Sequence, residues 1–149
     1  MLHLALYQPE IPQNTGTLIR FAACMGIKLD IIEPCGFVFD DTRLKRAGMD
    51  YLEIANINRH SDWDSFQNFY PQKRLILLDT KAKTNYLEFR FSPNDILLVG
   101  KESDGVPDSI FQNTDHQVKI IMQPFTRSLN MAVAASMVVG EALRQIRSV

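Results

Sequence analysis

The sequence predicts an α/β fold, a mostly parallel six-stranded sheet with helices on both faces. Short apolar runs alternate with segments of helical periodicity along the whole chain, and this alternation is typical of parallel sheets. The length of 149 residues corresponds to one domain with a substantial core. Because no repeat, low-complexity stretch or linker interrupts the pattern, we expect a single domain over residues 1–149.

Six short apolar runs are the expected strands. They are LHLALY (2–7), KLDIIEP (28–34), LEIANI (52–57), RLILLDT (74–80), DILLVG (95–100) and VKIIM (118–122). Buried parallel strands have such nearly continuous apolar character.

Helical patterns occupy the segments between these runs. The first covers 17–25, with Asn14 and Thr15 as candidate caps before it and Gly26 as its stop. The others are 40–48, 61–69, a short turn after Pro107 and the long final segment.

The final helix is apolar almost all round, whereas a surface helix normally has a polar stripe. It is either a central core helix, or a helix covered by its own sheet on one side and by a second subunit on the other. In the second case a charge at Val138 should give monomers or insoluble protein. Its uninterrupted apolar portion, 131–139, is much shorter than the ~20 residues of a membrane helix, so we expect no membrane association.

Composition limits the possible partners and cofactors. The net charge of -1 argues against a wholly basic nucleic-acid module but permits a local basic patch. Cys24 and Cys35 are too few and too far apart for a zinc site, and the stretch MLHLALYQPE has neither the basic region nor the length expected of a signal peptide. We therefore expect a cytoplasmic protein without metal, in which His3, His60 and His116 are surface or structural residues.

Standard phosphate-binding signatures are absent, but polar residues and glycines follow three expected strands, where parallel sheets usually bind ligands. In the first of these segments, 9–20, Arg20 lies off the apolar face of its helix. A guanidinium there could bind a phosphate or polarise a reacting group, or it could be an ordinary solvated or salt-bridged arginine.

The other two polar segments carry weaker signals. In 97–109, Gly100 ends a buried strand, which is also what a generic glycine turn would show. In 120–130, Ser128 and Asn130 can cap the final helix, but capping does not explain Arg127.

Together, four stretches resemble the motifs of the SPOUT, or α/β-knot, RNA methyltransferases: PEIPQNTGTLIR (9–20), IIEPCGFVFDDTRLKRAGMDY (31–51), VGKESDGVP (99–107) and TRSLNMAVAASMVVGEALRQ (126–145). Within that class they are most similar to the small tRNA 2'-O-methyltransferases that act on the wobble cytidine or uridine. The resemblance implies a deep C-terminal trefoil knot, a homodimer whose active site uses both chains, S-adenosylmethionine as cofactor and tRNA as partner.

The resemblance also implies roles for single residues. Arg20 matches the arginine beside the target ribose, and Asn130 matches the asparagine near the cofactor. The residues expected to line the S-adenosylmethionine pocket, largely through backbone groups, are Leu78, Gly100, Ile120 and Ser128. Those expected to contact RNA are Arg43, Lys45, Arg46 and Arg127, although RLKRAG alone is more often the solvated face of a short helix.

Two positions depart from the family pattern. Relatives commonly carry a tyrosine where this chain has Gly140 and an arginine where it has Asp104. Two other functions therefore stay open besides the wobble methyltransferase. One is an RNA-binding knot protein without efficient catalysis, and the other is a 2'-O-methyltransferase for another tRNA or rRNA ribose.

Overall fold

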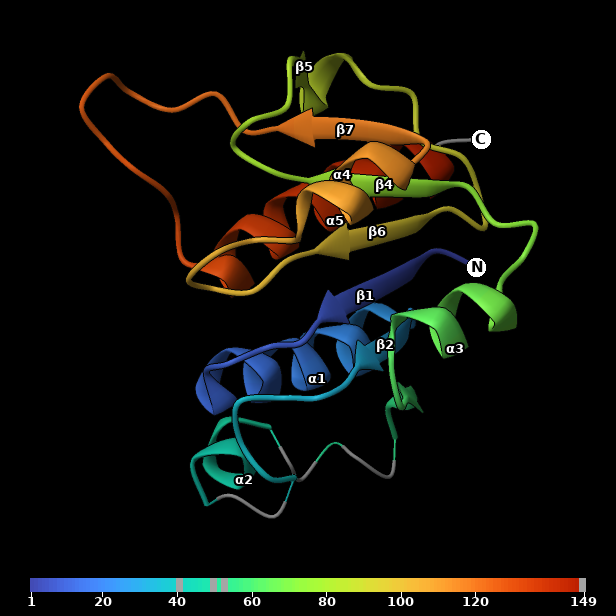
Figure 1. The fold of residues 1–149 in the computed structure, drawn as a ribbon, viewed down its shortest axis with the longest axis vertical. Coiled ribbons are helices and arrows are strands. Elements are labelled where there is room, and N and C mark those ends of the chain that lie inside the picture. Colours follow the sequence, from blue (N-terminus) through green and yellow to red (C-terminus); the bar gives the residue numbers. More distant parts are fainter. Residues whose placement is uncertain (40–41, 49–50, 52–53, 148–149) are drawn as a thin grey trace.

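The computed structural model describes residues 1–39, 42–48, 51 and 54–147, and a wholly parallel sheet runs through its centre (Figure 1). The strand order is β3-β2-β1-β6-β4-β7-β5. The strands are β1 (His3–Tyr7), β2 (Lys28–Ile32), β3 (Asn56–His60), β4 (Leu75–Leu78), β5 (Thr84–Asn85), β6 (Ile96–Val99) and β7 (His116–Lys119). The predicted parallel α/β class is confirmed.

Helices cover both faces of the sheet, as predicted. The helices are α1 (Pro12–Met25), α2 (Thr42–Gly48), α3 (Trp63–Phe69), the short 3-10 helix η2 (Tyr86–Glu88), α4 (Asp108–Asn113) and α5 (Met131–Arg147). Helices α1, α2 and α5 pack on one face, and α3 and α4 pack on the other.

The predicted strand count of six is wrong, because the described residues form seven strands. The additional strand, β5, has two residues and is too short to produce a hydrophobic pattern. The strand predicted at 52–57 lies instead at Asn56–His60, where an edge position permits the polar sequence NINRH. Residues 52–53 of that prediction lie outside the described residues, as do residues 40–41 of the second expected helix.

Helix α1 begins earlier than predicted and is not capped by Asn14 or Thr15. Pro12 occupies its first turn, where the missing N–H costs no hydrogen bond. Asn14 and Thr15 lie inside the helix and are buried. Gly26 ends the helix with φ +67°, so the predicted stop is correct.

The final helix α5 contributes to the core of its own chain. Ala135, Val138 and Val139 are buried against the sheet face that also carries α1. Burial of one such valine contributes about 1.5–3 kcal/mol. The expectation that a charge at Val138 gives monomers or insoluble protein stays a prediction. Because this side chain is fully buried in its own subunit, such a charge would act first on the core of that subunit.

The loop between β7 and α5 swings far outward before α5 returns behind β4 and β6 (Figure 1). The trefoil knot implied by the resemblance stays a prediction. No helix in the described part of the chain combines the length and apolar character needed to cross a membrane.

Candidate functional site

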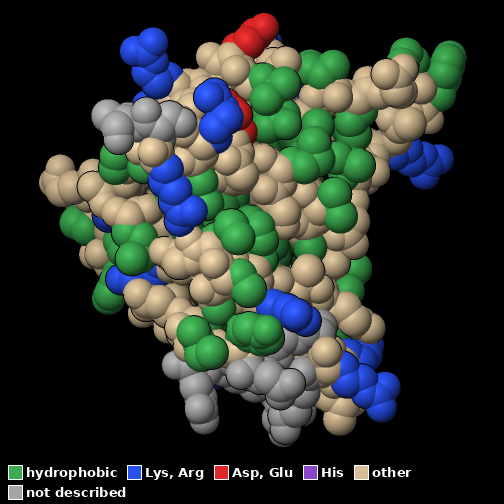
Figure 2. Space-filling model, turned by 180° about the vertical axis from the view of Figure 1, so that it is seen from behind, with side chains coloured by type: hydrophobic (Ala, Val, Ile, Leu, Met, Phe, Trp, Pro, Cys, Tyr) green, Lys and Arg blue, Asp and Glu red, His purple; other side chains and the backbone are tan. Residues whose placement is uncertain are grey.

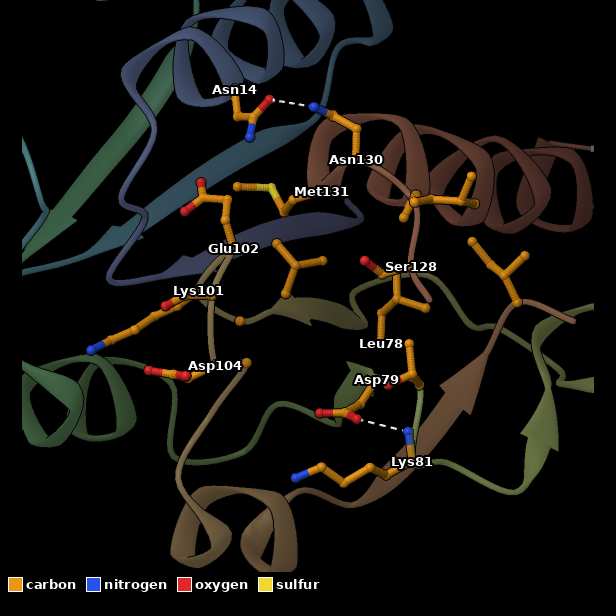
Figure 3. A pocket seen from close by; sticks show the side chains of 18 of the residues that line it. Asn14, Leu78, Asp79, Lys81, Lys101, Glu102, Asp104, Ser128, Asn130 and Met131 are labelled. Carbon is orange, nitrogen blue, oxygen red and sulfur yellow. Dashed lines mark hydrogen bonds between the residues drawn. The ribbon is translucent and has the colours of Figure 1, made fainter. Parts of the chain in front are cut away.

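A pocket of about 530 Å³ lies where β4, β6 and β7 end (Figure 3). Its walls are the loops that follow these strands, together with the first turns of α1 and α5. Ligands commonly bind at the carboxyl edge of parallel sheets. The four residues predicted to contact the cofactor all line this pocket: they are Leu78, Gly100, Ile120 and Ser128. Asn130, which was predicted to lie near the cofactor, lines it as well.

A tight turn from Gly100 to Gly105 builds one wall of the pocket. Lys101 and Gly105 exchange backbone hydrogen bonds of 2.9 and 3.0 Å, and Gly105 has φ +67°. A Cβ atom on Gly100 would lie 2.4 Å from the carbonyl carbon of Gly105. Since backbone cannot move away as a flexible side chain can, only glycine fits at position 100, and the wall there is bare backbone.

Asn130 connects α1 to α5 at the mouth of the pocket. Its Oδ1 accepts the backbone N–H groups of Ala132 (2.9 Å) and Val133 (3.2 Å), which caps α5. Its Nδ2 donates to Oδ1 of Asn14 at 2.9 Å (Figure 3). The capping role therefore belongs to Asn130, whereas Ser128 lies in the pocket wall.

A second connection, which sequence reasoning missed, joins the loop before α1 to the turn after β6. The Glu102 carboxylate accepts the N–H groups of Glu10 (2.7 Å) and Ile11 (3.3 Å). Ser103 donates to Glu10 through its backbone N–H (3.0 Å) and its hydroxyl (2.7 Å), and these bonds lower the pKa of Glu10. The partners are separated by more than 90 residues, so no local pattern could have revealed the pairing.

Charged side chains of both signs surround the pocket. Asp79, Glu102 and Asp104 bring carboxylates, and Lys81 and Lys101 bring ammonium groups. Asp79 is fixed by a 2.8 Å hydrogen bond from the backbone N–H of Lys81 (Figure 3). Asp104, one of the two departures from the family pattern, is thus part of the pocket wall.

Arg20, the predicted catalytic arginine, does not line this pocket in its own chain. It is exposed on α1, and its guanidinium carbon lies 5.1 Å from the ring centroid of Tyr51. Asn14, six residues earlier on the same helix, does line the pocket. The structure therefore separates the two predicted catalytic residues, Arg20 and Asn130, within one chain.

The arginines predicted to contact RNA lie on the surface in two separate segments. Arg43 and Arg46 are exposed on α2, which packs against α1, and Arg127 is exposed in the loop before α5. The side chain of Lys45 lies outside the described residues. Seen from the side of α1 and α5, Lys and Arg side chains are spread over the surface, and acidic side chains show only near its upper end (Figure 2).

A buried polar cluster on the opposite face was also missed. The fully buried Asp30 carboxylate contacts Nδ1 of His3 (3.2 Å), Nε2 of His60 (2.8 Å) and the hydroxyl of Tyr70 (2.8 Å). His3 and His60 are buried in this cluster and are therefore structural, as predicted. Within the described residues, no group of three His, Cys, Asp or Glu side chains is arranged so that it could hold a metal ion.

Comparisons with known proteins agree on one family. The model described as "SpoU rRNA Methylase family" matches residues 1–140. A tRNA (cytidine(34)-2'-O)-methyltransferase from Beijerinckia indica subsp. indica is 51% identical over 145 residues, which covers 96% of this chain and 91% of the relative. A protein of the same name from Ancylobacter novellus is 44% identical over 146 residues, 97% of this chain and 92% of the relative.

A solved structure supports the same relationship. The structure described as "Structural insights into the 2-OH methylation of C/U34 on tRNA" superposes with a TM-score of 0.95 at 39% sequence identity. The superposition covers 100% of this chain and 98% of the other.

Proposed function

This chain belongs to the SpoU rRNA methylase family, and from that premise we propose that it methylates the ribose 2'-hydroxyl of the wobble nucleotide, position 34, of tRNA. The methyl donor is S-adenosylmethionine. The observation that carries the proposal is the pocket in Figure 3, where residues from three strand ends and the start of α5 meet as the family resemblance requires. The substrate follows from relatives and a structural neighbour that share nearly the full length of the chain.

The pocket suits S-adenosylmethionine in size and chemistry. Its volume of about 530 Å³ lies within the range of small-molecule sites. The bare backbone at Gly100 lets a flat adenine approach N–H and C=O groups. Carboxylates such as Asp79 favour a ligand with a cationic sulfonium. Leu78, Gly100 and Ile120 would hold the cofactor through their backbones, and the bound cofactor supplies an activated methyl group.

The remaining tasks of the protein are to align the 2'-hydroxyl and to allow its proton to leave. Arg20 orients the ribose phosphate and stabilises the developing alkoxide. It does not act as the base, because a guanidinium stays protonated in proteins. A phosphate oxygen or water takes the proton.

A homodimer brings Arg20 to the pocket, and we propose that each site combines one subunit's pocket with the partner's Arg20. Two features support this. Arg20 lies outside the pocket of its own chain, and α5 presents an exposed apolar face with Val133 (50% exposed) and Met137 (39% exposed). Isologous contact through these faces would bury them on both subunits.

Arg43, Arg46 and Arg127, together with Lys45, would bind tRNA phosphates, and the dimer doubles their number. The cytoplasm, where tRNA is used, is the proposed location.

The test is incubation of the purified protein with labelled S-adenosylmethionine and unmodified tRNA, followed by nuclease digestion and mass mapping. We expect one 2'-O-methyl group, at nucleotide 34. Methylation of a different ribose, in tRNA or in added rRNA, would show that nucleotide 34 is not the substrate. Absence of label, with cofactor binding and intact RNA shown in parallel, would favour the non-catalytic RNA-binding protein.

A further inference from the structure

A second hollow, of about 480 Å³, lies at the same edge of the sheet, where the loop after β2 meets the end of β3. We propose that it binds one nucleobase of the RNA, a neighbour of the methylated nucleotide, by stacking on Phe37, Phe39 and Arg59. This inference rests on the proposed function and adds a base-recognition site to it.

The hollow presents flat surfaces of the kind on which bases stack. The rings of Phe37 and Phe39 lie 6.3 Å apart, with 31° between their planes. The guanidinium carbon of Arg59 lies 4.0 Å from the centroid of the Phe39 ring. Val38, which lies between these two phenylalanines in the sequence, is 67% exposed. Single-stranded RNA is recognised on aromatic rings and guanidinium planes of this type.

The charges of the hollow favour a base over a phosphate. Arg59 donates from Nη2 to Oε1 of Glu33 at 2.6 Å, so its charge is paired. A paired guanidinium attracts phosphate less than a free one but keeps its flat, stackable face. The Glu33 carboxylate also places a hydrogen-bond acceptor in the hollow, which matches the exocyclic amine of cytosine, adenine or guanine.

The hollow is connected to the cofactor pocket through one intervening loop. The backbone N–H of Gly36 donates to the carbonyl of Pro9 at 2.9 Å, and a Cβ on Gly36 would lie 3.0 Å from Cα of Glu10. Glu10 in turn bonds Ser103, which lines the cofactor pocket.

The separation of the two sites suits neighbouring nucleotides. The nearest strands of the two sites, β2 and β6, flank β1 on either side, so the ends of these two strands are about 10 Å apart. Adjacent nucleotides of a single-stranded loop can span this distance, which is why we place a neighbour of the methylated nucleotide in the hollow.

The test uses anticodon stem–loop RNAs with 2-aminopurine at one loop position at a time, because this base loses fluorescence when it stacks. With the wild-type protein we expect quenching at one position near nucleotide 34. Phe37→Ala should abolish that quenching and weaken RNA binding about 10-fold, whereas Phe37→Tyr should retain both. Phe69→Ala is the matched control, since this exposed phenylalanine packs beside His60 and Tyr70 on the opposite face of the sheet.

Equal quenching in the wild type and Phe37→Ala, or quenching at no position, would overturn the base site. Thermal melting shows whether Phe37→Ala is folded; if it is not, Arg59→Gln, which changes an exposed side chain, should reduce the same quenching. Methylation at nucleotide 34 is measured separately. Quenching without methylation would reject the proposed function and keep the base site, and methylation without quenching would do the reverse.

Discussion

The Asn130 side chain caps α5 and also bonds Asn14 of α1. Its replacement should therefore change both the stability of the fold and the binding of the cofactor. Asn130→Ala removes the cap of α5 and the bond to Asn14, so we expect a loss of about 1 kcal/mol in the free energy of unfolding and weaker binding of S-adenosylmethionine. Urea unfolding and calorimetric titration measure the two effects. Asn130→Asp keeps the capping acceptor and loses only the donor to Asn14. Wild-type cofactor affinity in Asn130→Ala would contradict a role at the pocket mouth.

Asp30 should make stability depend on pH. Burial alone would raise its pKa, but hydrogen bonds from His3, His60 and Tyr70 outweigh burial and lower the pKa below its ordinary value. A carboxyl group whose pKa is lower in the folded state stabilises the protein above its unfolded pKa, about 3.9. This contribution is lost as the pH falls through the folded pKa.

We therefore expect Asp30→Asn to lower the free energy of unfolding at pH 7 by about 3 kcal/mol, and the difference from wild type to shrink below about pH 4. Urea unfolding at a series of pH values measures both. Equal stability of the two proteins at pH 7 would show that the Asp30 cluster contributes nothing to the free energy of unfolding.

The residues of the site could be predicted from the sequence where they belong to a motif of the family. The family resemblance implied four pocket residues, and these do line one pocket in the structure: Leu78, Gly100, Ile120 and Ser128. The pairs Glu10–Ser103 and His3–Asp30 join residues distant in sequence. They arise from strand order, which periodicity does not determine.

At the scale of elements, the turn from Gly100 to Gly105 should tolerate no side chain at its first residue. Gly100→Ala would place a methyl group 2.4 Å from backbone carbon, so the turn must open into the pocket. We expect at least a 10-fold loss of S-adenosylmethionine affinity, measured by titration calorimetry, with the fold retained by circular dichroism. Gly140→Ala is the matched control, because a Cβ there meets nothing within 4 Å. Unchanged affinity in Gly100→Ala would mean that the turn does not hold the cofactor.

Strands could be predicted where burial gives them a continuous apolar sequence, but they could not be predicted at the edges of the sheet. Strands β1, β4 and β6 are central and apolar, and they lie within the predicted ranges. The edge strand β3 has a polar sequence, and β5 is only two residues long. Helix α1 starts at Pro12, before the apolar repeat begins, because proline supports a first turn, and Asn14 in that turn lines the pocket.

At the scale of the whole molecule, the proposed dimer should depend on the outer face of α5. Met137→Glu adds a charge to a side chain that is already 39% exposed, so the monomer should stay folded while association is lost. We expect sedimentation to show a dimer for the wild type and a monomer for Met137→Glu. Val138→Glu is unsuitable because it would bury a charge in the core. A wild-type monomer with full activity would reject the dimer.

Mixing two inactive variants tests whether each active site is shared. Arg20→Ala should abolish methyl transfer while S-adenosylmethionine still binds, since the proposed contact of Arg20 is with the ribose and its phosphate and not with the cofactor. Gly100→Ala should lose cofactor binding in its own pocket but still supply Arg20 to its partner. If sites are shared, a mixed dimer has one site with both defects and one with neither. After equal mixing and subunit exchange, half of the dimers are mixed, so about a quarter of wild-type activity should return. If each chain used its own Arg20, every site would carry one defect, and the mixture would stay inactive.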